Sequence, residues 1–316
     1  MLRGFCMLLI IWFHTEMYYV GYDVTPYSYY VGDALAVFFF LSGFLFYSDN
    51  QLFNAGRKLY SVFRWLLIPY LFFTSLLYLP KALYYHSGIG EIVVDILTGH
   101  ASWFVCSLIV AEILFIVALY LFQKRSILIF VSALLALFYS AIIGNGQSSW
   151  CYEQNLWHIN EAMLGFFMMT IGYFFHQYEN LFREKIDNIF TLSVLIILSF
   201  GLKFLIGYIH PQLIFGPIIV SNYCLFITDL LSVTLLLVMV FRRLPSIRIL
   251  EWVGQRSIVY YFFAGGAPFV VSSFLKLVGL FYCGIHTLVL TFAIVCILST
   301  LLVCAVYRYT KIVRPI

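Results

Sequence analysis

Long apolar runs separated by short polar connections fill most of the 316-residue chain. A helix needs about 20 predominantly apolar residues to cross roughly 30 Å of hydrocarbon, and ten runs approach or reach that length. The ten predicted membrane-spanning helices lie at 2–20, 33–48, 64–80, 102–122, 127–143, 160–176, 189–208, 220–241, 257–280 and 284–307. The run at 88–98 is too short to span and is interpreted as an interfacial or re-entrant segment. The pattern predicts an all-α polytopic membrane protein with one integral membrane domain over residues 1–316.

The basic residues concentrate in alternate connections. Under the ten-helix assignment, all but three of the 18 Lys and Arg residues fall on one side of the membrane. The exceptions are Lys81, Lys203 and Lys276. Because cytoplasmic loops carry an excess of Lys and Arg, this asymmetry predicts that both termini are cytoplasmic.

The composition excludes an ordinary soluble domain. Hydrophobic residues make up 63% of the chain and charged residues 10%, whereas about a quarter of an ordinary soluble domain is charged. The net charge of +4 matters mainly for where the basic residues fall, and we expect no nucleic-acid partner. The seven cysteines form no C-x-x-C pair and are interpreted as packing residues, with a Cys151–Cys283 bridge as the alternative. We expect no metal site, because there is no H-E-x-x-H motif and the histidines are scattered.

The first predicted span, MLRGFCMLLIIWFHTEMYYV, carries Arg3, His14 and Glu16. An ionisable side chain at the bilayer centre costs about 3 kcal/mol or more on insertion scales, so such a residue is a functional candidate. Eleven residues at about 100° each place Arg3 and His14 on one helix face, with His14 about 16 Å from Arg3 along the axis. Glu16 lies about 200° around the helix from His14, and we expect it to face the outer vestibule.

Three further polar residues share the predicted depth of His14. Ser42, Glu112 and Asp229 each lie nine residues from the outer start of their helix, about 13 Å in. We therefore predict one buried polar site formed by these three residues and His14.

Each of these residues also has a structural interpretation. Arg3 can be a snorkelling anchor at the inner face. His14 and Ser42 can be helix-packing residues. Asp229 can pair with Lys203, whose amine reaches inward from the outer part of its helix.

Several motifs follow one another along the chain. They are the Arg3-x10-His14 spacing, FFFLSGF with Ser42 and Gly43, RKLYSVFRWLLIPY, SWF at 102–104, the glycines Gly165 and Gly172, and WVGQRSIVYY. In this order and ten-helix setting they resemble the acyltransferase-3 family of integral membrane acyltransferases over most of the chain.

The resemblance implies transfer of an acyl group, often acetyl, from cytoplasmic acyl-CoA to a hydroxyl of a carbohydrate or lipid-linked glycan at or beyond the outer face. It also implies that the protein lies in a bacterial inner membrane, in contact with its lipids, and binds no cofactor. Arg3 and His14 match the key pair of the family. The chain departs from the family at Ala264, where many members have a histidine. It also starts almost on Arg3, without the usual short leader, which is compatible with a start codon further upstream.

A mechanism follows from these assignments. We expect basic side chains at the cytoplasmic end of the helices to bind the phosphates of acyl-CoA. These side chains are Arg3, Arg57, Lys58 and Arg64. Ordinary membrane anchoring is the alternative for Arg57 and Lys58. A neutral His14 can then accept the proton of the acceptor hydroxyl, or relay the acyl group covalently. Glu112 or Asp229 can orient His14, and Ser42 can stabilise the oxyanion.

Two other functions fit the same residues. A proton-coupled transporter or flippase for a glycan or lipid also uses intramembrane His, Glu and Asp, but it predicts no thioester cleavage. Another class of membrane acyltransferase, or an enzyme that modifies an amine or a lipid, would differ in its product.

Overall fold

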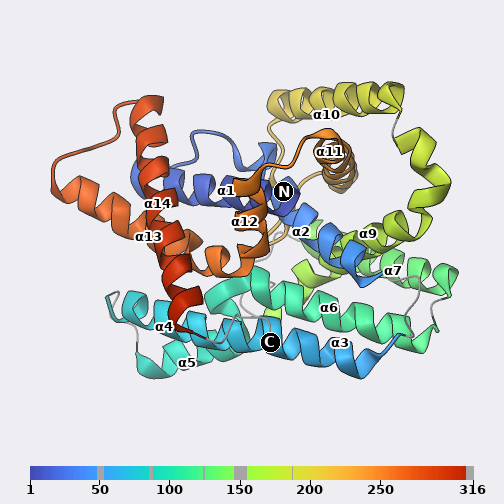
Figure 1. The fold of residues 1–316 in the computed structure, drawn as a ribbon, viewed down its shortest axis with the longest axis horizontal. Helices are drawn as coiled ribbons and strands as arrows, with labels where there is room; N and C mark the ends of the chain where they lie inside the picture. The colour runs from blue at the N-terminus through green and yellow to red at the C-terminus, as the bar shows by residue number, and fades with distance from the viewer. Residues whose placement is uncertain (48–52, 85–87, 124, 146–154, 187, 311–316) are drawn as a thin grey trace. The chain divides into compact units, whose positions relative to one another are not determined.

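The computed structural model describes residues 1–47, 53–84, 88–123, 125–145, 155–186 and 188–310, and these are almost entirely helical (Figure 1). Contacts group the chain into two compact units, residues 1–34 with 244–316 and residues 35–243. The single membrane domain over 1–316 stays a prediction.

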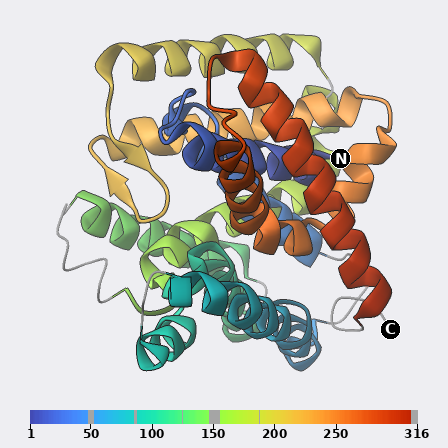
Figure 2. The same cartoon turned by 90° about the vertical axis from the view of Figure 1, so that its left-hand side faces the viewer.

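The first unit joins the two ends of the chain. Its elements are α1 (Leu2–Thr15), a π-helical turn (Glu16–Val20), a 3-10 turn (Tyr27–Tyr29), the first residues of α2 (Val31–Phe46), α12 (Arg248–Gln255), α13 (Ser257–Leu277) and α14 (Ile285–Tyr309). Helix α1 packs against α12, α13 and α14, and α13 packs along α14 (Figures 1 and 2).

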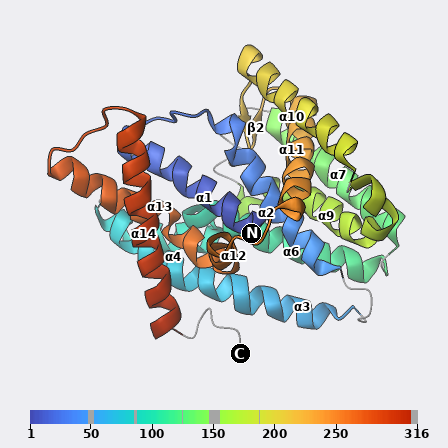
Figure 3. The same cartoon turned by 45° about the horizontal axis from the view of Figure 1, so that its top comes forward.

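The second unit contains the remaining helices and one small hairpin. Its elements are the rest of α2, α3 (Ala55–Val62), a π-helical turn (Phe63–Leu67), α4 (Ile68–Tyr84), α5 (Ile89–Thr98), a 3-10 turn (His100–Ser102), α6 (Trp103–Leu121), α7 (Ser126–Asn145), a 3-10 turn (Leu156–His158), α9 (Ile159–Ile186), α10 (Ile189–Ile209), β1 (Leu213–Ile214), β2 (Ile219–Val220) and α11 (Tyr223–Arg243). Helix α9 packs against α6 and α7, and α10 packs against α11 (Figure 3).

The hairpin corrects the all-α prediction to nearly all-α. Strands β1 and β2 pair antiparallel, with Leu213 opposite Val220 (Figure 2). The turn between them holds Gly216 against the indole of Trp103, where an added Cβ would lie 2.4 Å from the ring. The hairpin thus folds back onto the start of α6.

Helices occupy all ten predicted ranges, but fewer of them qualify as spans by length and hydropathy. Within the described residues seven do: Ala55–Leu77, His100–Leu121, Ser126–Gly144, Ile189–Ile209, Tyr223–Arg243, Ser257–Leu277 and Ile285–Tyr309. The apolar helix α2 is shorter, and α1 ends after 14 residues where the π-helical turn begins. The count of ten and the cytoplasmic termini stay predictions.

Glycines allow α2 and α9 to cross at backbone contact. A Cβ on Gly43 would lie 1.8 Å from the carbonyl oxygen of Met169, and one on Gly172 would lie 2.0 Å from that of Phe40. Small residues at helix interfaces let membrane helices approach closely, and this crossing tolerates nothing larger than hydrogen at either position.

Enlarging this crossing is expected to destabilise the protein. Gly172→Ala forces the helices apart, and overpacking of this kind costs about 1–3 kcal/mol. We therefore expect a lower midpoint of thermal unfolding in detergent for Gly172→Ala and for Gly43→Ala. Gly201→Ala in α10 is the matched control, because nothing lies within 4 Å of its Cβ position. Equal midpoints for Gly172→Ala and Gly201→Ala would contradict the crossing.

Candidate functional site

Arg3 and His14 lie at opposite ends of α1. Arg3 is in the first turn, His14 is in the last, and both are half-buried. Because α1 is α-helical from Leu2 to Thr15, the two side chains emerge from one face, about 16 Å apart along the axis.

A π-helical turn begins two residues after His14 and positions a tyrosine against it. The rings of His14 and Tyr18 are nearly parallel, with centroids 6.4 Å apart. Tyr18 also meets the ring of Phe269 in α13 edge-on, and Lys276 Nζ donates to the Tyr18 carbonyl oxygen at 2.9 Å. Since π-helical turns are frequent at functional sites, this one supports a functional role for its surroundings.

Glu16 holds the loop after the π-helical turn. Its carboxylate accepts hydrogen bonds from Trp12 Nε1 at 2.7 Å, Thr25 N at 3.3 Å and Tyr30 Oη at 3.2 Å. Burial is the main cause that raises the pKa of Tyr30, and the negative charge of Glu16 raises it further. Tyr30 therefore remains a neutral hydrogen-bond donor. The side chain of Glu16 is fully buried, which corrects the expectation that it faces an open vestibule.

Three predicted site residues meet in the second unit. Ser42 Oγ donates to Glu112 Oε1 at 3.0 Å, linking α2 to α6. The ammonium of Lys58 lies over the ring of Phe46, 4.6 Å from its centroid, and attracts Glu112 electrostatically. The hydroxyl proton of Ser42 is therefore directed at Glu112, and Ser42 would have to turn away from it to stabilise an oxyanion.

Asp229 has the partner that its structural interpretation named. Lys203 Nζ lies 2.6 Å from Asp229 Oδ2, joining α10 to α11, and the Asp229 side chain is buried. Removing one member of such a buried pair destabilises the protein, because the other charge is left uncompensated. The pairing gives Asp229 a structural role, and its catalytic role stays a prediction.

The other basic candidates lie along the segment from α3 to α4. Arg57 is exposed, and its backbone N–H donates to Asn54 Oδ1 at 2.9 Å, where the asparagine caps α3. The guanidinium of Arg64 lies 4.9 Å from the ring centroid of Trp65. Their assignment to the donor's phosphates stays a prediction.

Comparison with known families identifies the chain. Residues 1–308 match the acyltransferase-3 profile, which is described as an acyltransferase domain. The chain belongs to the acyltransferase-3 family. No curated protein and no solved structure matches it. Together with the apolar helices, membership makes this protein an integral membrane acyltransferase and confirms the resemblance drawn from its motifs.

Tyr18 lies beside Gly265, the residue that follows Ala264 in α13. Ala264 is buried in α13, and the Tyr18 hydroxyl lies 3.9 Å from the Cβ position of the next residue, Gly265. Among the described residues, nothing lies within 4 Å of the Cβ position of Gly266. A glycine of α13 thus borders Tyr18. Sequence reasoning missed Tyr18, although its position four residues after His14 is a signal for contact along a helix.

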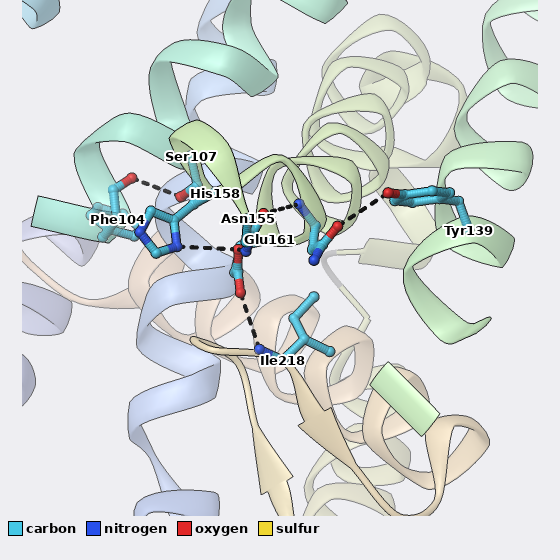
Figure 4. A network of polar contacts seen from close by, with 8 residues as sticks. Phe104, Ser107, Tyr139, Asn155, His158, Glu161 and Ile218 are labelled. Carbon is cyan, nitrogen blue, oxygen red and sulfur yellow. Dashed lines mark hydrogen bonds and ion pairs between the residues drawn. The ribbon is translucent and has the colours of Figure 1, made fainter. Parts of the chain in front are cut away.

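A second polar network, also missed from the sequence, surrounds Glu161 at the start of α9 (Figure 4). Glu161 Oε2 accepts from Asn155 Nδ2 at 2.6 Å and lies 3.4 Å from His158 Nδ1. Glu161 Oε1 accepts from the backbone N–H of Ile218 at 3.1 Å. Asn155, His158 and Glu161 are all buried. Since both carboxylate oxygens are engaged, the network ties the β-hairpin turn to the first turn of α9.

The Asp229–Lys203 pair provides a test of buried charge in this acyltransferase. Asp229→Leu or Lys203→Met alone leaves the charge of the partner unpaired, and we expect either to lower the free energy of unfolding by about 3–5 kcal/mol. The double variant removes both charges, so we expect it to unfold at a higher temperature than either single variant. Thermal unfolding of the four proteins in one detergent measures this cycle, and losses that simply add would show that the two side chains do not interact.

Proposed function

We propose that the protein is an acyl-CoA-dependent O-acyltransferase. It transfers an acyl group to a hydroxyl of a carbohydrate or lipid-linked glycan of the cell envelope. The proposed acyl group is acetyl, which members of the family often transfer. The proposed setting is a bacterial inner membrane, with the donor on the cytoplasmic side. The observation that carries the proposal is the placement of Arg3 and His14 on one face of α1 in a member of the acyltransferase-3 family.

The two residues suit the two ends of the donor. An arginine presents a planar fork of N–H donors that matches phosphate oxygens, so Arg3 binds the nucleotide end of acyl-CoA. The slim pantetheine arm extends from Arg3 along α1. The thioester then lies near His14, about 16 Å further along the helix.

His14 acts on the proton that the reaction must move. The acceptor oxygen attacks the thioester carbonyl while a neutral imidazole takes the hydroxyl proton. The C–S bond then breaks, the new ester leaves with the acyl group, and the CoA thiolate takes up a proton. Tyr18, which is stacked on His14, limits the orientations of the imidazole.

The test measures release of free CoA by protein purified into nanodiscs and supplied with acetyl-CoA and other short-chain acyl-CoAs. We expect release by the wild type, a loss of at least about 100-fold for His14→Ala, as general-base removal typically gives, and weaker donor affinity for Arg3→Ala. His286→Gln, an exposed histidine just inside α14, is the matched control and should match the wild type.

Two results would oppose this function. Turnover unchanged by His14→Ala would remove His14 from the chemistry. Absence of both acyl-CoA binding and CoA release, with a glycan fraction from the native membrane present, would instead favour a transporter that cleaves no thioester.

A further inference from the structure

Arg256 is clamped between two aromatic rings at the junction of α12 and α13. Its guanidinium carbon lies 4.5 Å from the ring centroid of Trp252 in α12 and 5.1 Å from that of Tyr307 near the end of α14. Arg256 Nη1 also donates to the Trp252 carbonyl oxygen at 3.3 Å. These contacts hold a long side chain in one place before any ligand binds.

Among the described residues, the Arg256 guanidinium makes one hydrogen bond, so most of its N–H donors have no partner there. Stacking on rings engages the face of a guanidinium, whereas its five N–H donors lie in the plane. In the described part of the chain, no Asp or Glu lies within ion-pair distance of Arg256. The side chain is half-buried, so an acceptor can approach its edge.

A close contact between α1 and α12 brings Arg3 near Arg256. A Cβ on Gly4 would lie 2.0 Å from the carbonyl oxygen of Leu250, so α1 touches the backbone of α12. A Cβ on Gly254 would lie 3.6 Å from Cβ of Arg3. Arg256 follows Gly254 by two residues, which puts the bases of two arginine side chains within about one helical turn of each other.

We propose that Arg256 binds a phosphate group of the acyl-CoA donor next to Arg3. The inference rests on the proposed function, because it assigns a second donor-binding residue to the same reaction. A pre-oriented guanidinium with a free edge binds phosphate through parallel N–H···O bonds at little entropic cost. A phospholipid headgroup carries the same chemistry, so the experiment must separate the two sources.

The experiment compares Arg256→Gln, Arg256→Lys and the control Arg248→Gln in nanodiscs. Arg248 is an exposed arginine of α12. Each protein is assayed for acetyl-CoA binding and for KM and kcat of CoA release. We expect Arg256→Gln to weaken binding and raise KM about 10- to 100-fold, the range for a lost charged hydrogen bond. We expect a nearly constant kcat, a partial loss for Arg256→Lys, and wild-type values for Arg248→Gln.

Acetyl-CoA that lacks its 3′-phosphate identifies the phosphate involved. If Arg256 binds the 3′-phosphate, Arg256→Gln and wild type bind this donor equally. If Arg256 binds the diphosphate, the variant loses the same factor with either donor. The first outcome supports contact with the 3′-phosphate. The second supports contact with the diphosphate when kcat stays nearly constant and Arg256→Lys loses only part of the binding, because a residue that only holds α14 to α12 would not give that combination.

Three results would overturn it. The first is unchanged acetyl-CoA binding by a folded Arg256→Gln. The second is a difference between wild type and variant that appears only in discs with anionic phosphatidylglycerol and not in phosphatidylcholine, which would assign Arg256 to lipid. The third is a lowered kcat with an unchanged KM. Failure of the proposed function is distinct, because wild type would then neither bind acetyl-CoA nor release CoA, and that result would overturn the assignment of Arg256 as well.

Discussion

Lipid offers no hydrogen bonds, so every polar group within an apolar helix bundle must be satisfied by the protein itself. This constraint explains the polar contacts of both units. Glu16 gathers Trp12 and the loop that leads to α2, and Lys203 neutralises Asp229 across two helices. Ser42 donates to Glu112. Each costly polar group therefore fixes the position of a neighbouring helix, and the apolar surface between them needs only to pack.

Packing in turn explains part of what the family motifs encode. The FFFLSGF stretch has glycine at position 43 because the carbonyl oxygen of Met169 occupies the space of a side chain, and Gly172 meets the carbonyl oxygen of Phe40 in the same way. The adjacent Ser42 is presented from that crossing toward Glu112. The FFFLSGF motif thus combines a close helix crossing with one polar contact.

The sequence predicted what depends on position along a helix. Apolar run length located helices in all ten predicted ranges, and the eleven-residue spacing placed Arg3 and His14 on one face of α1. Depth alone also put Ser42 and Glu112 in one layer, and the structure joins them. Depth does not fix lateral position, however, and Asp229 at the same predicted depth pairs with Lys203. The spacing of four residues signals the contact between His14 and Tyr18, whereas the backbone contact that brings Arg3 to Gly254 depends on tertiary packing, which leaves no periodic signal.

We propose that His14 serves acyl transfer from a cytoplasmic donor to an acceptor on the other face. Sealed vesicles of native membranes containing wild type or His14→Ala, in inside-out and right-side-out orientations, test it directly when acetyl-labelled acetyl-CoA is added outside. We expect hydroxylamine-labile label on envelope glycan only in inside-out vesicles and only with wild type. Equal labelling in both orientations, or labelling that persists in His14→Ala, would contradict it.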